Sequence, residues 1–112
     1  MWARSAHKKR IMVMKLRDKT ETEIVREICQ YLTARNIFHW RDKSGHTGGK
    51  RYGKSGVADI LGIYKGRPLA IEVKCPNGAT RSEQYKFLTE FQNRGGIQFI
   101  ARSLEEVMER LK

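Results

Sequence analysis

The sequence predicts a single α/β domain in which a mixed central sheet is flanked by helices. Three observations support this prediction. The chain has 112 residues, enough for one compact domain. Helical and strand-like periodicities follow one another in the order α-β-β-β-α-β-α. A short turn pairs the second and third strands, and no repeat or internal boundary interrupts the series.

The first helix begins at Thr20, because Thr20-x-x-Glu23 fits a capping box whose hydroxyl and carboxylate bind free amides of the first turn. Apolar side chains then recur at helical spacing up to Asn36, which closes the helix. Residues 37–41 are rich in strand formers and predict the first strand. The apolar stripe of the helix consists of Ile24, Val25, Ile28, Tyr31 and Leu32.

A basic arm, residues 1–19, precedes the domain, which we expect to span residues 20–112. The apolar stretch at 11–14 fits either an extra strand or a mobile tail. No apolar run approaches the roughly 20 residues of a membrane span, and the basic start lacks the apolar middle of a secretory signal. We therefore expect a cytoplasmic protein without membrane association.

The rest of the chain divides at its glycines and prolines. Residues 44–56 contain five Gly and predict a loop. Strands at 57–64 and 69–74 follow, joined by a turn at 65–68. A second helix at 80–93, a strand at 97–101 and a short last helix capped by Ser103 complete the domain.

The net charge of +11 is large for this length and lies mostly in one half of the chain. Residues 1–56 carry 14 Lys and Arg against 5 Asp and Glu, whereas residues 57–112 carry 9 against 7. Such clustering indicates a polyanionic partner, because Lys and Arg displace the counterions of phosphates. A solubilising surface is the alternative. The two Cys and three His lack zinc-ligand spacing, which favours free thiols in a reducing compartment.

Candidate chemistry lies on the two paired strands. Side chains alternate along a strand, so Glu72 and Lys74 project from the same face of the segment 69–74. Asp59 is a second acid inside a hydrophobic run on the preceding strand. Two converging carboxylates beside a Lys suit a hard divalent cation acting on a phosphate. The alternative is a cross-strand salt bridge without catalytic function.

The surroundings of these residues favour the catalytic interpretation. The glycine-rich loop before Asp59 carries basic and aromatic side chains suited to nucleic acid. Ser82-x-Gln84 opens the helix after the Glu72 strand, and a helix start favours phosphate. The candidate nucleic-acid-binding residues are Arg41, Lys50, Arg51, Tyr52, Lys54 and Ser82.

The pattern G-V-A-D-I-x-G-I, then L-A-I-E-V-K-C-P-N-G, then Ser82-x-Gln84 resembles the PD-(D/E)xK nuclease superfamily. Within it, the chain is similar to the virus-type replication-repair nuclease (VRR-NUC) domain. The resemblance runs from about Glu21 to the C-terminus and implies an α-β-β-β-α-β nuclease core with a short C-terminal helix. Ala58 stands where the superfamily name has its proline.

The resemblance implies a role for each matching residue. Asp59, Glu72 and the backbone carbonyl of Val73 would hold Mg²⁺ or Mn²⁺, and Lys74 would be the catalytic lysine. Gln84 would reach the active site from the second helix. The family also has a Glu on its first helix, for which Glu21 is the first choice and Glu27 the second.

A stand-alone domain of this length resembles phage-encoded members of the family, which are associated with branched DNA. The resemblance implies DNA repair chemistry such as cleavage of four-way (Holliday) junctions, within the bacterial host's cytoplasm. Paired cuts on opposing strands imply a homodimer. The alternatives are a monomeric nuclease acting on flaps or ends, and a non-catalytic nucleic-acid-binding domain of the same fold.

Overall fold

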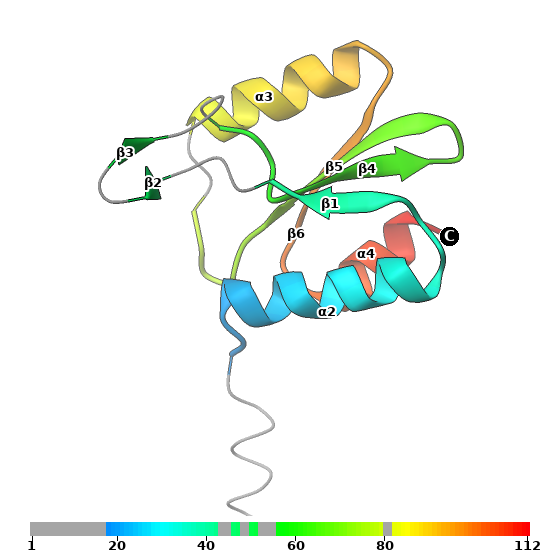
Figure 1. Ribbon diagram of the computed structural model, residues 1–112. Helices are drawn as coiled ribbons and strands as arrows, with labels where there is room; N and C mark the ends of the chain where they lie inside the picture. Colours follow the sequence, from blue (N-terminus) through cyan, green and yellow to red (C-terminus); the bar gives the residue numbers. More distant parts are fainter. Residues whose placement is uncertain (1–17, 43–45, 48–49, 52–55, 80–81) are drawn as a thin grey trace, which may run out of the picture.

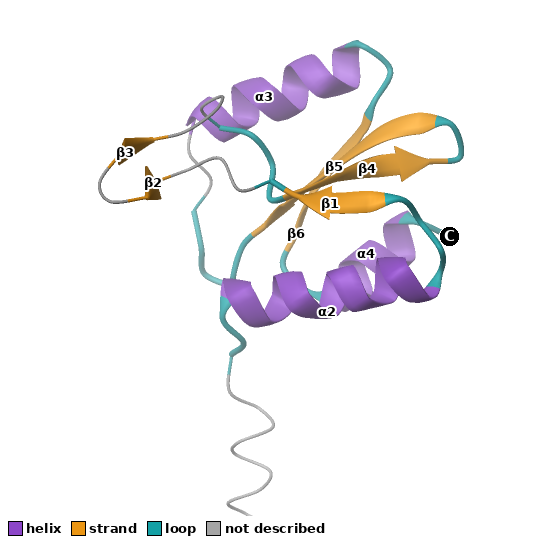
Figure 2. Ribbon diagram, in the orientation of Figure 1, coloured by secondary structure: helices purple, strands orange, loops and turns teal. Residues whose placement is uncertain are grey.

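The computed structural model describes residues 18–42, 46–47, 50–51, 56–79 and 82–112, and the first 17 residues of the expected arm lie outside this description. A sheet lies between helices, with α3 on one face and α2 and α4 on the other (Figures 1 and 2). The elements in order are α2 (Glu21–Ala34), β1 (His39–Arg41), β2 (His46–Thr47), β3 (Lys50–Arg51), β4 (Ile60–Tyr64), β5 (Arg67–Val73), α3 (Ser82–Asn93), β6 (Ile97–Ala101) and α4 (Leu104–Arg110).

The central sheet has four strands in the order β1-β4-β5-β6. β4 pairs antiparallel with both β1 and β5, whereas β5 and β6 are parallel because α3 carries the chain back across the sheet. This arrangement confirms the predicted α/β fold with a mixed sheet flanked by helices and a short C-terminal helix.

The boundaries of the paired strands differ from the sequence prediction. The β4–β5 turn is only two residues long, and both Lys65 and Gly66 have positive φ, at 50° and 79°. A two-residue turn of this kind matches the twist of a hairpin, so the residues expected in the turn, Arg67 and Pro68, enter β5. β4 begins at Ile60 rather than at 57, and the predicted loop 44–56 contains the two-residue strands β2 and β3.

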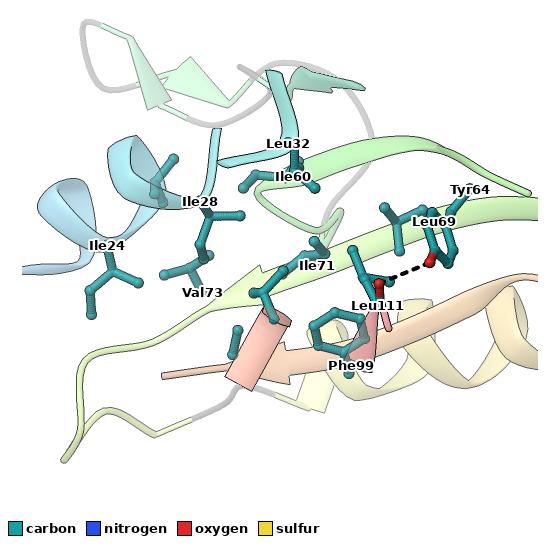
Figure 3. Packing of buried hydrophobic residues seen from close by; sticks show 13 residues of the cluster. Ile24, Ile28, Leu32, Ile60, Tyr64, Leu69, Ile71, Val73, Phe99 and Leu111 are labelled. Carbon is teal, nitrogen blue, oxygen red and sulfur yellow. Dashed lines mark hydrogen bonds between the residues drawn. The ribbon is translucent and has the colours of Figure 1, made fainter. Parts of the chain in front are cut away.

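The main core fills the space between the sheet and α2 with α4 (Figure 3). Ile24, Ile28 and Leu32 recur every four residues on α2 and are buried against the sheet, as their spacing predicted. The chain end is fastened to the same core, since the Tyr64 hydroxyl donates a 2.8 Å hydrogen bond to the Leu111 carbonyl (Figure 3). The sheet residues of this cluster include Ile60, Leu69, Ile71, Val73 and Phe99.

The predicted helix caps are present. The Thr20 hydroxyl accepts a 3.2 Å hydrogen bond from the Glu23 amide, and the Glu23 carboxylate accepts from Thr20 in return, which confirms the capping box. Ser103 caps α4, since its hydroxyl accepts a hydrogen bond from the Glu106 amide. Across the described residues, no helix combines the length and the apolar composition needed to cross a membrane.

Candidate active site

The two candidate acids lie where β5 extends beyond the start of β4. Ile60 pairs with Ile71, so continuing the register places Asp59 opposite Glu72. The sequence placed Asp59 on the strand, but it immediately precedes the first β4 residue. Its Oδ2 accepts a 2.8 Å hydrogen bond from the Val73 backbone N–H. The Asp59 carboxylate therefore satisfies a β5 amide that no further β4 backbone group reaches.

Glu72 is a buried acid in an unfavourable setting for its charge. Glu72 is only 2% exposed, and its Oε2 has no hydrogen-bond partner among the described residues. Burial, a hydrogen bond with Asp59 and the Asp59 charge together raise the pKa of Glu72 to about 9, against a smaller opposing effect of Lys74. An isolated buried carboxylate is costly, so this arrangement calls for a positive ligand or a proton.

Lys74 lies one residue past β5 and is held at both its backbone and its side chain. Its backbone N–H donates a 3.0 Å hydrogen bond to the Ala101 carbonyl, which continues the β5–β6 ladder. Its Nζ is 3.9 Å from Glu21 Oε1, and the Lys74 side chain is 13% exposed. The first turn of α2 thus contributes an acid to this end of the sheet. Glu27, the second choice for that acid, pairs with Lys19 instead.

The oxygen atoms gathered here fit a hard divalent cation. In an extended residue the N–H and C=O point to the same edge, so the Val73 carbonyl faces the Asp59 side, as its N–H does. Two carboxylates and a carbonyl suit Mg²⁺ or Mn²⁺, and Mg²⁺ often takes its remaining ligands from water and substrate phosphates. Among the described residues, no three His, Cys, Asp or Glu side chains form a complete metal site.

The remaining candidate residues take different positions. The N-terminal ends of α2 and α3 lie at the same end of the sheet as the C-terminal end of β5 (Figure 1). Gln84 is half-buried on the first turn of α3, and Arg41 is exposed at the end of β1. Ser82 begins α3, and Lys50 and Arg51 form β3, but only their backbones are described. Tyr52 and Lys54 lie outside the described residues.

Arg102 is a contributor that the sequence analysis missed. Its guanidinium donates 2.8 Å hydrogen bonds to the carbonyls of Cys75 and Gly78, which belong to the segment directly after Lys74. These contacts fix the path of the chain as it leaves the acid pair. They join residues 24 to 27 positions apart, so no local sequence pattern indicates them.

Gly62 was also missed, although it holds β1 close to the site. A Cβ at this position would lie 2.5 Å from the Phe38 carbonyl oxygen, so only glycine allows β1 to approach β4 this closely. The approach aligns the next residues as well, because the Asp42 backbone N–H donates a 3.0 Å hydrogen bond to the Asp59 carbonyl. Gly62 therefore supports the segment that carries Asp59.

Comparison with solved structures identifies the architecture. A solved structure described as a VRR_NUC domain protein superposes with a TM-score of 0.55 at 16% sequence identity, over 83% of this chain and 85% of that chain. The chain has the VRR_NUC fold. No family model and no curated protein matches the sequence. At this identity the structural match establishes the fold, and the functions of individual residues depend on the geometry described above.

Proposed function

We propose that this chain is a metal-dependent nuclease that hydrolyses phosphodiester bonds in DNA. The observation that carries the proposal is the buried Glu72 carboxyl beside Asp59, with one oxygen lacking a partner among the described residues. Buried and strongly perturbed acids are typical of functional sites. The VRR_NUC fold of the chain supports a nuclease in particular.

Each residue of the site has a distinct function in this proposal. Asp59, Glu72 and the Val73 carbonyl would hold Mg²⁺ or Mn²⁺, which when bound would supply Lewis acidity toward a phosphate oxygen and a water molecule. The Lys74 ammonium orients the attacking water or neutralises charge on the pentacovalent phosphate. Glu21 positions Lys74 through their 3.9 Å ion pair, and Gln84 contacts the site from α3.

A purely structural salt bridge is the less favoured interpretation of the same residues. A structural Lys would be expected to neutralise the buried acid next to it. Here the Lys74 charge offsets only part of the raised pKa of Glu72, its ion pair is with the half-exposed Glu21, and Glu72 Oε2 has no hydrogen-bond partner in the described residues. This distribution leaves a buried carboxylate available to a cation and an ammonium available to a phosphate.

Metal dependence tests the proposal directly. Supercoiled plasmid incubated with the protein should be cut in Mg²⁺ or Mn²⁺ and left intact in excess chelator. Isothermal titration with Mn²⁺ gives a readout independent of cleavage, and Glu72→Gln should abolish both binding and cutting. Cleavage that persists in chelator would exclude this mechanism.

We extend the proposal to branched DNA cut by a homodimer of phage type. One chain offers one acid pair, whereas resolving a four-way junction needs two cuts on opposing strands, which two-fold symmetry supplies. Light scattering should report twice the 13.0 kDa chain mass, and four-way junctions should be cut in preference to linear duplex and flaps. A monomer that prefers flaps would instead support an end- or flap-directed nuclease.

A further inference from the structure

A groove of about 470 Å³ separates the outer side of α2 from β1. On the α2 side it is lined by Thr22, Arg26, Cys29, Gln30, Thr33 and Ala34. Arg41 lines it from β1. Both arginines are exposed, and no acidic side chain is among the lining residues.

The length and chemistry of the groove fit an extended anionic chain. Thr22, Arg26, Gln30 and Thr33 follow one stripe of α2, so the helix wall is about 16 Å long at 1.5 Å per residue. At the 3.4 Å rise of one DNA strand, this length corresponds to roughly five nucleotides. Guanidinium groups bind phosphates through several N–H donors, and hydroxyls and amides supplement them.

Two residues that line the groove are next in sequence to residues that contact the candidate active site. Thr22 follows Glu21, whose carboxylate lies 3.9 Å from Lys74 Nζ. Arg41 precedes Asp42, whose backbone N–H donates to the Asp59 carbonyl. Both walls of the groove are thus one residue away from residues that contact the site. In Figure 1, α2 and β1 lie side by side.

We propose that this groove binds the sugar–phosphate backbone of the nucleic acid to one side of the cleaved phosphate, with Arg26 and Arg41 each contacting a phosphate; the inference rests on the proposed nuclease function. The charge of the chain favours this occupant over a second copy. A copy with net charge +11 would bring further positive charge to a groove that already holds two arginines and no acid, whereas a polyanion complements them.

Binding measurements in varied salt test the two arginines. In a Glu72→Gln background, which prevents cleavage, fluorescence anisotropy gives the affinity for labelled DNA at each salt concentration. Arg26→Gln and Arg41→Gln should each weaken binding several-fold and reduce the salt slope by about 0.7 to 0.9, the value expected for a single phosphate. Arg94→Gln is the matched control, because Arg94 is 82% exposed just after α3 and should leave the slope unchanged.

The half-buried Cys29 thiol reports occupancy of the groove itself. In a Cys75→Ser background, maleimide alkylation of Cys29 should slow several-fold when DNA is added. Burial raises the pKa of this thiol and slows its reaction, so the rates with and without DNA are compared at the same near-neutral pH, where maleimide stays selective for thiols. Circular dichroism verifies that each variant is folded.

The outcomes separate the inference from the function on which it rests. Unchanged salt slopes, together with Cys29 alkylation that DNA does not slow, would refute the groove as a DNA-binding site, even if the protein still binds and cuts DNA. A change in oligomeric state caused by Arg26→Gln or Arg41→Gln, with no change in the salt slope, would assign the groove to an interface between copies instead. A wild-type protein that neither binds nor cuts any DNA would overturn the proposed function as well.

Discussion

Glu72→Gln should stabilise the metal-free protein, and the gain should increase with pH. The pKa of Glu72 is raised from 4.5 to about 9 in the folded chain, chiefly by burial and then by Asp59. Between these values the folded state binds one proton that the unfolded state has released. The stability of the wild type therefore falls as pH rises through this window, whereas the glutamine side chain of the variant does not ionise.

The size of the effect follows from the proton count. One proton changes the free energy of unfolding by at most about 1.4 kcal/mol per pH unit. The difference in unfolding free energy between the variant and the wild type (the stability gap) would therefore grow by up to about 4 kcal/mol from pH 5 to pH 8. Water that enters the metal-free site would stabilise the ionised form and reduce this figure. We therefore expect a growth of about 2 kcal/mol.

Urea unfolding in chelator at pH 5, 6, 7 and 8 measures the gap, with circular dichroism as the probe. Repeating the series in Mn²⁺ should reverse the order at pH 8, because a cation bound to ionised Glu72 stabilises only the wild type. This metal binding should raise the unfolding free energy of the wild type by about 2.7 kcal/mol at a metal concentration 100 times the Kd. A gap that stays constant with pH would refute the raised pKa, and equal stabilisation of both proteins by Mn²⁺ would refute Glu72 as a ligand.

Three further predictions concern other parts of the chain. Lys74→Ala should reduce kcat at least 100-fold while leaving Mn²⁺ affinity within about twofold by titration calorimetry, since the proposal has its ammonium act on the phosphate and not on the cation. Retained activity would show that Lys74 is not the catalytic lysine. Gly62→Ala should destabilise the fold by about 2 kcal/mol in urea, because the added Cβ would meet the Phe38 carbonyl 2.5 Å away; no loss would mean that β1 is easily displaced. Replacing Lys50, Arg51 and Lys54 with Gln should flatten the salt dependence of DNA binding by about one unit for each phosphate that the loop binds, with little change in the cleavage rate at saturation; an unchanged slope would show that the loop does not bind the DNA backbone.

Elements defined by local chemistry could be predicted from the sequence. α2 follows from a capping box and an apolar stripe that involve only near neighbours, and both features are present. Alternation along β5 was predicted correctly, since Leu69, Ile71 and Val73 belong to the main core, whereas Ala70 packs with Leu88 of α3. Helix and strand periodicities need no knowledge of the partner element, which is why the order of the helices and of the four central-sheet strands was predicted correctly.

Features set by contacts between distant residues could not be predicted. The start of β4 depends on where its pairing with β5 ends, so Asp59 falls just outside the strand in which apolar neighbours had placed it. The pairing of β2 with β3 is equally invisible in a glycine-rich segment, because strand formation depends on the partner more than on propensity. Arg102 shows the same limit, since its role depends on carbonyls at least 24 residues away.

The unequal ends of β4 and β5 explain why the acid pair forms where it does. Since the β4 backbone stops pairing at Ile60, the Val73 N–H would be left unsatisfied unless another acceptor reached it. The Asp59 side chain supplies that acceptor, and the same hydrogen bond fixes its carboxylate beside Glu72. One hydrogen bond thus satisfies the last amide of the ladder and also holds the acid pair together.

Apolar positions elsewhere can exchange similar residues without changing the fold, which is consistent with 16% identity to a chain of the same architecture. The proposed chemistry depends on far fewer positions, and most of the residues assigned to it lie at this strand end.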